Sequence, residues 1–250
     1  MKIGVIGAGN MAGALVRGWN EPVVVSDIDS ERATALAESV GGTVAGSNAE
    51  VAQQADVVVL CHKPAQLEEV AAEIRDSARA VISILGGVPV ADVEAAYPDT
   101  PVYRFMPNQA AAVRRGVSCY AAGSRAADGP EQEIIDLFGR IGTVVPLPEE
   151  QMETATAVMS CAPAWFALVA EALVDAGVEH GLDSEKAGLL VAAALAGTGM
   201  LLDEAGLSPE EVRRRVTSPG GLTERGTVRL EEAGIRAAFD SAVDAVVNPS

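Results

Sequence analysis

The sequence is poor in the residues that cross-link a chain or ligate a metal. It has three cysteines in 250 residues, at wide spacing and without a CxxC pair. A disulfide framework and a structural zinc site are therefore both disfavoured, and no metal is expected. A reducing, cytoplasmic compartment fits this cysteine usage best. The three cysteines are Cys61, Cys119 and Cys161.

Basic residues are also scarce. Lysine and arginine together number 18 against 35 acidic residues, so the formal net charge is -17 and the pI is near 4.4. Binding to nucleic acid or to an anionic membrane surface would have to overcome like-charge repulsion. We therefore expect neither as a partner.

Long apolar segments and a secretory signal are missing as well. The start, MKIGVIGAG, passes from one lysine into a short apolar stretch without the charged region and cleavage site of a signal peptide. The longest apolar run, residues 187–202, is shorter than the roughly 20 residues of a membrane-spanning helix. With 49% of its residues apolar, the chain can nevertheless bury a substantial core.

Short β-branched runs alternate with helical stretches from residue 1 to about 146. This alternation predicts an α/β fold with a doubly wound, mostly parallel sheet that has helices on both faces. The predicted strands lie at residues 2–6, 23–26, 56–61, 80–85, 101–106, 117–121 and 143–147.

The sequence pattern changes after Pro148, where clusters of β-branched residues are replaced by helical patterns. The acidic, proline-flanked stretch 146–150 marks the expected boundary between a domain of residues 1–148 and an all-helical domain of residues 149–250. Two predicted helices, 160–178 and 185–204, are apolar around most of their circumference, so dimerisation through them is expected. The alternative is that they pack against the first domain of the same chain.

The first predicted strand is followed by a glycine-rich turn of the GxGxxA form that opens a helix. Gly7 permits a tight turn, Gly9 lets the backbone approach a pyrophosphate, and Ala12 lets the helix pack near the sheet. In a chain that continues the strand–helix alternation, this pattern predicts a Rossmann-type domain that binds NADH or NADPH. The predicted contacts are Gly7, Gly9, Asn10, Met11 and Ala12.

Asp27 follows the second predicted strand, where a carboxylate accepts hydrogen bonds from ribose hydroxyls and repels a 2′-phosphate. This placement favours NADH over NADPH, although Arg32 or Ser30 could still hold a phosphate. The alternative role for Asp27 is a charge at the N-terminus of the next helix.

Two further segments follow predicted strands at the edge where ligands of such folds bind. Lys63 could meet a phosphate or ribose, and Pro64 is expected to start a helix. His62 is more simply interpreted as a structural histidine than as an acid. After the strand at 101–106, an apolar shelf and an amide are expected beside the nicotinamide, unless the segment is an ordinary loop. The predicted cofactor contacts are His62, Lys63, Pro64, Met106, Pro107 and Asn108.

The order of these segments resembles the Δ1-pyrroline-5-carboxylate reductases, which make proline. The resemblance rests on GAGNMA at 7–12, HKP at 62–64, RFMPN at 104–108, APAW at 162–165, EALVDAGVEHGLDSEKA at 171–187 and VTSPGGLTERG at 216–226. It covers essentially the whole chain. The last segment is the most diagnostic, because many other dehydrogenases share the glycine fingerprint.

The segment from Ser218 to Thr223 has a physical rationale of its own. It precedes a helix expected from about Leu222, so its backbone N–H groups and two hydroxyls can hold a substrate carboxylate. The alternative is a helix-breaking turn and cap. By resemblance, Thr223 is the hydroxyl nearest the imine nitrogen and acts as hydrogen-bond donor or proton relay. The predicted substrate contacts are Ser218, Pro219, Gly220, Gly221, Leu222 and Thr223.

The sequence departs from the family pattern at Cys161, Trp165, Leu222 and the Gln109-Ala110 pair. These departures leave open a six-membered piperideine carboxylate, a specialised biosynthetic imine, or a non-catalytic dinucleotide-binding regulator. A β-hydroxyacid-type dehydrogenase is disfavoured, because such enzymes use a lysine in the helical domain and Lys186 is the only lysine after residue 63. No histidine is placed to activate Cys161 as a nucleophile.

Overall fold

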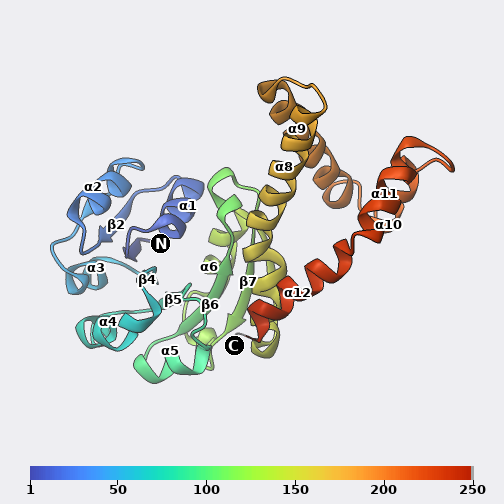
Figure 1. Cartoon of the computed structure of the whole chain (residues 1–250). Coiled ribbons are helices and arrows are strands. Elements are labelled where there is room, and N and C mark those ends of the chain that lie inside the picture. The colour runs from blue at the N-terminus through green and yellow to red at the C-terminus, as the bar shows by residue number, and fades with distance from the viewer. Residues whose placement is uncertain (249–250) are drawn as a thin grey trace. The chain divides into compact units, whose positions relative to one another are not determined.

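The computed structural model describes residues 1–248 and forms two compact units, which divide between Pro163 and Ala164 (Figure 1). Residues 249–250, the end of the predicted second domain, lie outside the described residues. We describe each unit by itself.

The first unit contains an eight-stranded sheet with the order β3-β2-β1-β4-β5-β6-β7-β8. All neighbouring strands run parallel except β6 and β7, which are antiparallel. The predicted mostly parallel sheet is confirmed. The strands are β1 Ile3–Ile6, β2 Val23–Ser26, β3 Thr43–Val44, β4 Val57–Leu60, β5 Val81–Ser83, β6 Val102–Pro107, β7 Gly116–Ala122 and β8 Gly142–Pro146.

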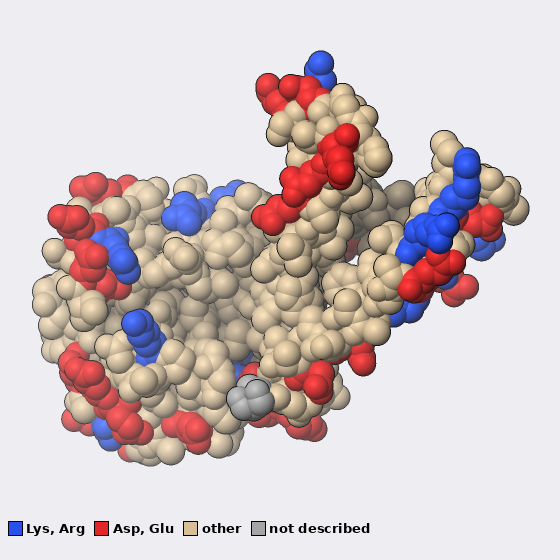
Figure 2. All heavy atoms as spheres, in the orientation of Figure 1, with Lys and Arg blue, Asp and Glu red and all other residues tan. Residues whose placement is uncertain are grey.

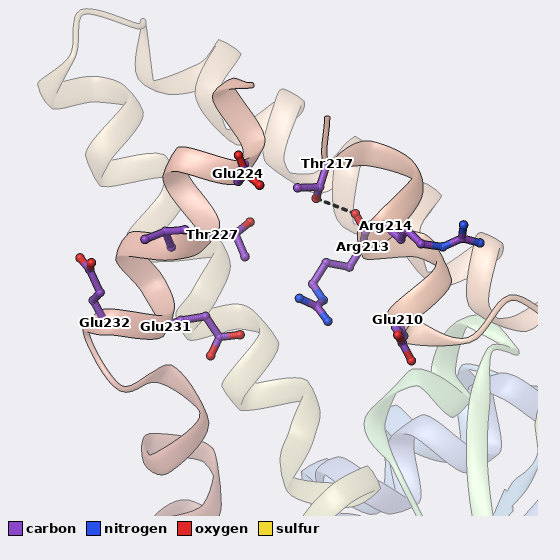
Figure 3. A pocket seen from close by; sticks show the side chains of 9 residues that line it. Glu210, Arg213, Arg214, Thr217, Glu224, Thr227, Glu231 and Glu232 are labelled. Carbon is purple, nitrogen blue, oxygen red and sulfur yellow. Dashed lines mark hydrogen bonds between the residues drawn. The ribbon is translucent and has the colours of Figure 1, made fainter. Parts of the chain in front are cut away.

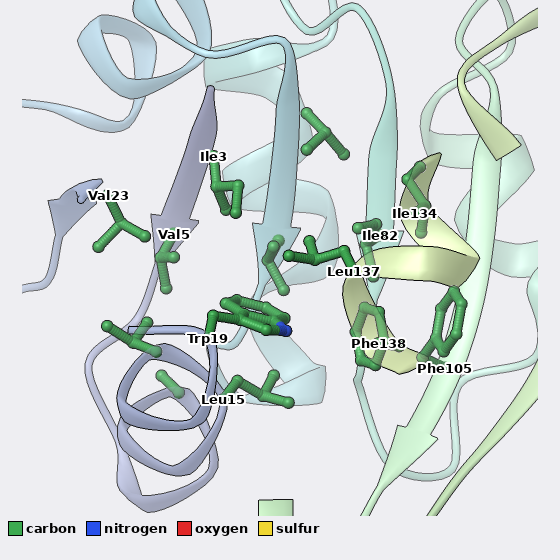
Figure 4. Packing of buried hydrophobic residues seen from close by; sticks show 14 of the residues in the cluster. Ile3, Val5, Leu15, Trp19, Val23, Ile82, Phe105, Ile134, Leu137 and Phe138 are labelled. Atoms are coloured by element: carbon green, nitrogen blue, oxygen red, sulfur yellow. The ribbon is translucent and has the colours of Figure 1, made fainter. Parts of the chain in front are cut away.

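Helices cover both faces of this sheet. Side chains from α1, α2 and α6 pack on one face, where Trp19 meets Phe138 edge-on and Phe138 stacks on Phe105 (Figure 4). Side chains from α3, α4 and α5 pack on the other face. The chain is therefore doubly wound, as predicted. These helices are α1 Asn10–Trp19, α2 Ser30–Glu38, α3 Asn48–Gln54, α4 Leu67–Ile74, α5 Val90–Ala96 and α6 Glu131–Gly139.

The segment that follows β8 stays on the sheet before the chain enters the second unit. It comprises a 3₁₀ turn at Glu149–Gln151, α7 Met152–Ala155 and a π-helical turn at Thr156–Cys161. Met152 is fully buried and packs with Met106 and Cys119 of β6 and β7. Residues 149–163 therefore belong to the compact sheet unit, although the expected domain boundary lies before them.

The second unit is built from helices alone. Among its described residues, only Ala187 and Val212 are buried, whereas many large apolar side chains are exposed, including Leu168 at 64% and Leu189 at 71%. Such a unit cannot form a core by itself. Its helices are α8 Ala162–Glu179, α9 Ser184–Asp203, α10 Pro209–Val216, α11 Leu222–Glu232 and α12 Ile235–Val247.

Helices α8 and α9 expose an extensive apolar surface. The continuous helical segment 149–179 and helix α9 are long and apolar enough to cross a membrane, judged by length and composition only, and the most apolar windows are 17% and 6% buried. Charged side chains are mostly acidic, in keeping with the net charge of -17, and uncharged surface lies between them in the face shown in Figure 2. An apolar helix surface of this size is typical of an interface.

Candidate functional site

The glycine turn after β1 has the geometry that its sequence predicts. Gly7 has φ +99, and a Cβ there would lie 2.7 Å from the carbonyl carbon and oxygen of Cys61. The N–H of Gly7 donates to the carbonyl of Ser26 at 2.8 Å. A side chain at position 7 is thus excluded both by the backbone conformation and by the neighbouring strand.

Open space begins two residues later. No heavy atom lies within 4 Å of a Cβ built on Gly9, which is the N-cap of α1. No side chain caps this helix, and its first turn has no acidic residue. The N–H groups of Asn10, Met11 and Ala12 are therefore available to an anion, as a pyrophosphate site requires.

Asp27 is held firmly at the end of β2. One carboxylate oxygen accepts from the N–H of Ala8 at 2.6 Å, and the other accepts from the N–H of Asp29 at 2.8 Å. The helix charge considered as an alternative role belongs instead to Asp29, which caps α2 and pairs with Arg32. Asp27 thus ties the end of β2 to the glycine turn.

The end of β4 completes a pocket of about 380 Å³ beside the turn. Gly7, Gly9, Asp27, His62 and Lys63 are among the residues that line it. No ion pair holds the exposed ammonium of Lys63 within residues 1–248. Pro64 begins a 3₁₀ turn that leads into α4, as expected. The pocket therefore combines the glycine turn, a carboxylate and a free cation.

His62 and Cys61 are unsuited to acid or nucleophile roles in this arrangement. The Nδ1 of His62 donates to the carbonyl of Lys63 at 2.9 Å, and burial lowers the pKa of His62, so the ring is neutral at neutral pH. Burial raises the pKa of the Cys61 thiol. The structural interpretation of His62 is the simpler one.

The residues at the end of β6, which the sequence predicts to face the nicotinamide, have little exposed surface. Met106, Pro107 and Asn108 are all buried. The amide nitrogen of Asn108 donates to the carbonyl of Met159 at 3.1 Å, and its oxygen accepts from the N–H of Val117. The side chain of Asn108 thus fastens the π-helical turn to the sheet, and only a small part of its surface is left for a cofactor.

An ion cluster around one buried arginine lies near this strand end, and no sequence pattern predicted it. Arg104 on β6 is 2% exposed, and its guanidinium contacts Glu149 at 2.6 Å and Glu153 at 2.8 Å. Glu149 also accepts from the N–H of Val90, the first residue of α5. No local pattern reveals this cluster, because its members lie far apart in the sequence.

The predicted substrate loop lies in the helical unit. Gly221 is the N-cap of α11, which begins at Leu222 as expected. The hydroxyl of Thr223 is exposed and has no hydrogen bond to any residue of the described chain. The N–H of Gly220 is taken, since it donates to the carboxylate of Glu224 at 2.6 Å. The N–H groups of Leu222 and Thr223, in the first turn of the helix, have no intrahelical partner.

A pocket of about 500 Å³ lies between α10 and α11, next to this loop. Charges of both signs line it, and none of the six predicted loop residues does (Figure 3). The hydroxyl of Thr217 donates to the carbonyl of Arg213 at 2.6 Å inside it. Its residues are Glu210, Arg213, Arg214, Thr217, Glu224, Thr227, Val228, Glu231 and Glu232.

Two family profiles match the chain. The profile for pyrroline-5-carboxylate reductase dimerisation matches residues 149–250, and the profile for NADP oxidoreductase, coenzyme F420-dependent, matches residues 2–87. The first match explains the exposed apolar faces of α8 and α9 as a dimer interface. The chain is a homo-oligomer through its helical half, and its sheet half is an NAD(P)H-dependent oxidoreductase domain.

Similar proteins extend over the full length of the chain. The pyrroline-5-carboxylate reductase of Methanosarcina acetivorans is 36% identical, and the match covers 97% of this chain and 94% of that protein. The 1-pyrroline-5-carboxylate reductase structure from Streptococcus pyogenes has a TM-score of 0.90 at 28% identity and covers 99% of this chain and 97% of that one. The Plasmodium falciparum pyrroline carboxylate reductase with NADP bound has a TM-score of 0.86 at 26% identity, with coverages of 99% and 95%. The chain belongs to the pyrroline-5-carboxylate reductase family.

Proposed function

We propose that the chain reduces 1-pyrroline-5-carboxylate to L-proline with hydride from NADH or NADPH. The observation that carries the proposal is that the chain has both an open, uncapped glycine turn in its sheet unit and an uncapped helix N-terminus after Gly221 in a helical unit of this family. We assign dinucleotide binding to residues 1–148, and dimerisation and substrate binding to residues 149–250. The three free cysteines and the relatives' biosynthetic activity support a cytoplasmic location.

The residues of the sheet unit fit a dinucleotide. The space over Gly9 and the free N–H groups of the first turn of α1 would receive the pyrophosphate. Asp27 would accept from ribose hydroxyls, and Lys63 would face a phosphate or ribose. When bound, the nicotinamide supplies the hydride that the imine carbon accepts.

Asp27 also supports the preference for NADH. Its two backbone hydrogen bonds keep the carboxylate from turning away, so a 2′-phosphate at the end of β2 would meet a fixed negative charge. The neighbouring Arg32, which also lines the pocket, is paired with Asp29, and Ile28 carries no charge, so neither offers an unpaired cation there.

In the helical unit, we assign the substrate carboxylate to the N–H groups of Leu222 and Thr223. Both belong to the first turn of α11, whereas the N–H of Gly220 is engaged by Glu224. The free hydroxyl of Thr223 would donate to the ring nitrogen. As hydride adds to the imine carbon, the C=N π electrons move to nitrogen, which takes up a proton from the Thr223 hydroxyl, and solvent returns a proton to that hydroxyl.

The test is a panel of cyclic imines assayed with NADH and with NADPH on the purified chain. We expect oxidation of the nicotinamide with pyrroline-5-carboxylate, faster with NADH. Cys161, Trp165 and the exposed Leu222 depart from the family pattern, so the panel includes a six-membered imine. Turnover of that imine alone would identify it, and not pyrroline-5-carboxylate, as the substrate. Cofactor binding without turnover of any imine would indicate a regulator.

A further inference from the structure

We propose that Arg104 is a positioning residue for the reduction, which sets where the π-helical turn Thr156–Cys161 rests on the carboxyl end of β6. This inference builds on the proposed function and on the expectation from the sequence that this strand end lies beside the nicotinamide. Arg104 touches neither cofactor nor substrate, and acts through the helical segment that it holds.

Arg104 joins three elements of the sheet unit at one buried point. Its guanidinium rises from β6 and contacts Glu149 in the 3₁₀ turn and Glu153 in α7. Glu149 in turn accepts from the N–H of Val90, where α5 begins after the loop that follows β5. The cluster therefore connects β6 and the start of α5 to the helical segment that packs on β6 and β7.

The segment held by these carboxylates continues directly into the π-helical turn. This turn rests on the last residues of β6, where Asn108 donates to the carbonyl of Met159 and the hydroxyl of Ser160 donates to the carbonyl of Pro107. π-helical turns are rare and concentrate at functional sites. A shift of residues 149–155 along the sheet would pass to this turn through the continuous helical backbone.

Apolar packing alone would not fix the register of the segment. Met152 is buried against Met106 and Cys119, and such contacts are not directional. Two ion pairs from one planar guanidinium are directional, because the donor geometry is rigid.

Stability does not explain the cluster well. The Nε of Arg104 and the second carboxylate oxygen of Glu149 are buried without a partner in the described part of the chain. Buried ion pairs are often replaced by apolar side chains without loss of stability. We therefore explain a buried arginine with an unsatisfied Nε by a requirement for position rather than by a contribution to folding.

The experiment compares Arg104→Met, Arg104→Lys and Glu153→Gln with the wild type. Glu153 is half exposed, so its substitution leaves the fold intact. The matched control is Arg140→Met, which breaks an exposed ion pair with Glu21. These two residues precede β8 and β2, respectively, in the chain. NADH affinity, kcat, KM and the deuterium isotope effect from labelled NADH are measured for each.

We expect Arg104→Met to lower kcat by about tenfold or more, because displacements near 1 Å can cost up to a hundredfold in rate. NADH affinity should stay within about twofold, since the glycine turn is untouched. The isotope effect on kcat should rise as hydride transfer becomes slower than product release. Arg104→Lys and Glu153→Gln should give intermediate values, because each keeps one of the two ion pairs.

Equal losses in NADH affinity and kcat, the same losses in Arg140→Met, or wild-type kinetics in Arg104→Met would overturn the assignment. If Arg104→Met failed to fold, Glu153→Gln would decide the question by the same kinetic ratios. If the wild type reduced no imine, the proposed function would fail by itself. The fluorescence of bound NADH, unchanged in Arg104→Met, would then refute the role of Arg104, and a shifted spectrum with unchanged affinity would support it.

Discussion

At the scale of single residues, Asp27 is the group most directly linked to cofactor choice. Its carboxylate is fixed by the N–H groups of Ala8 and Asp29, so its negative charge stays at the end of β2. We predict that Asp27→Ser raises the NADPH-to-NADH ratio of kcat/KM by about tenfold, equivalent to ~1.4 kcal/mol. Steady-state kinetics with both nicotinamides provide the measurement.

Asp27→Asn is the matched control, because it removes the charge while keeping the size of the side chain and one acceptor oxygen. A rise of the ratio in both variants would identify the charge as the cause. An unchanged ratio in both would show that Asp27 does not lie near the 2′ position.

Thr223 carries the second residue-scale prediction. Its hydroxyl is exposed at the first turn of α11 and makes no hydrogen bond with the described chain. We expect Thr223→Ala to lower kcat by at least about tenfold with little effect on NADH affinity, as typical losses of a proton-transfer group are 10²–10⁴-fold. Pre-steady-state and steady-state kinetics on pyrroline-5-carboxylate measure the change.

Thr227→Ala is a suitable control, since Thr227 lies one turn further along the same helix and donates to the carbonyl of Thr223. Thr223→Ser should retain most of the activity. If Thr227→Ala and Thr223→Ala lost equal activity, the hydroxyl of Thr223 would have no specific part in the reaction.

Residue types predicted local backbone features better than they predicted which residues form hydrogen bonds or ion pairs with one another. The positive φ of Gly7 and the capping position of Gly221 follow from local patterns. That Glu224 occupies the N–H of Gly220 does not, because the sequence equally allows an exposed glutamate. The ion cluster around Arg104 depends on tertiary packing, which local sequence patterns do not predict.

At the scale of elements, the turn between β1 and α1 contains one glycine that the fold requires, Gly7, and one that we expect only cofactor binding to require, Gly9. A Cβ at position 9 meets no atom within 4 Å, and its φ is -74, so Gly9→Ala should fold normally. The added methyl would lie where the pyrophosphate approaches the backbone. We predict an unchanged melting temperature and an NADH dissociation constant raised by about tenfold, or ~1.4 kcal/mol, by calorimetry.

Gly7→Ala serves as the contrasting variant. Its Cβ would approach the Cys61 carbonyl to 2.7 Å at φ +99, so the fold itself should lose stability. Normal NADH binding by Gly9→Ala would mean that the dinucleotide does not use this turn.

The strands and helices with clear periodicity were predicted to within a few residues. The edge strand Thr43–Val44 was missed because it has two exposed residues and no apolar alternation. The π-helical turn was also missed, since the apolar stretch from residue 160 is equally compatible with a regular α-helix. Hydrogen bonds to Asn108 and Pro107 hold this turn, and these tertiary contacts are not visible in the local sequence.

At the scale of the whole molecule, the helical unit depends on a second copy. The two residues that are buried within its described part cannot stabilise five helices, and the dimerisation profile, residues 149–250, spans the whole unit. The sequence predicted this need from the apolar circumference of two helices. It placed the boundary at 148/149, where the dimerisation profile also begins, whereas the compact sheet unit extends to Pro163 because Met152 and Glu149 pack on the sheet.

Transfer of deuterium to the product from NADH deuterated at both C4 positions tests the central claim most directly. The chain, pyrroline-5-carboxylate and the labelled cofactor are incubated, and the product is analysed by mass spectrometry and NMR. We expect L-proline with one deuterium on the ring carbon that was the imine carbon, and several-fold less of it from Gly9→Ala at limiting cofactor. Unlabelled proline, or no proline alongside tight NADH binding, would contradict direct hydride transfer from the cofactor to the imine carbon.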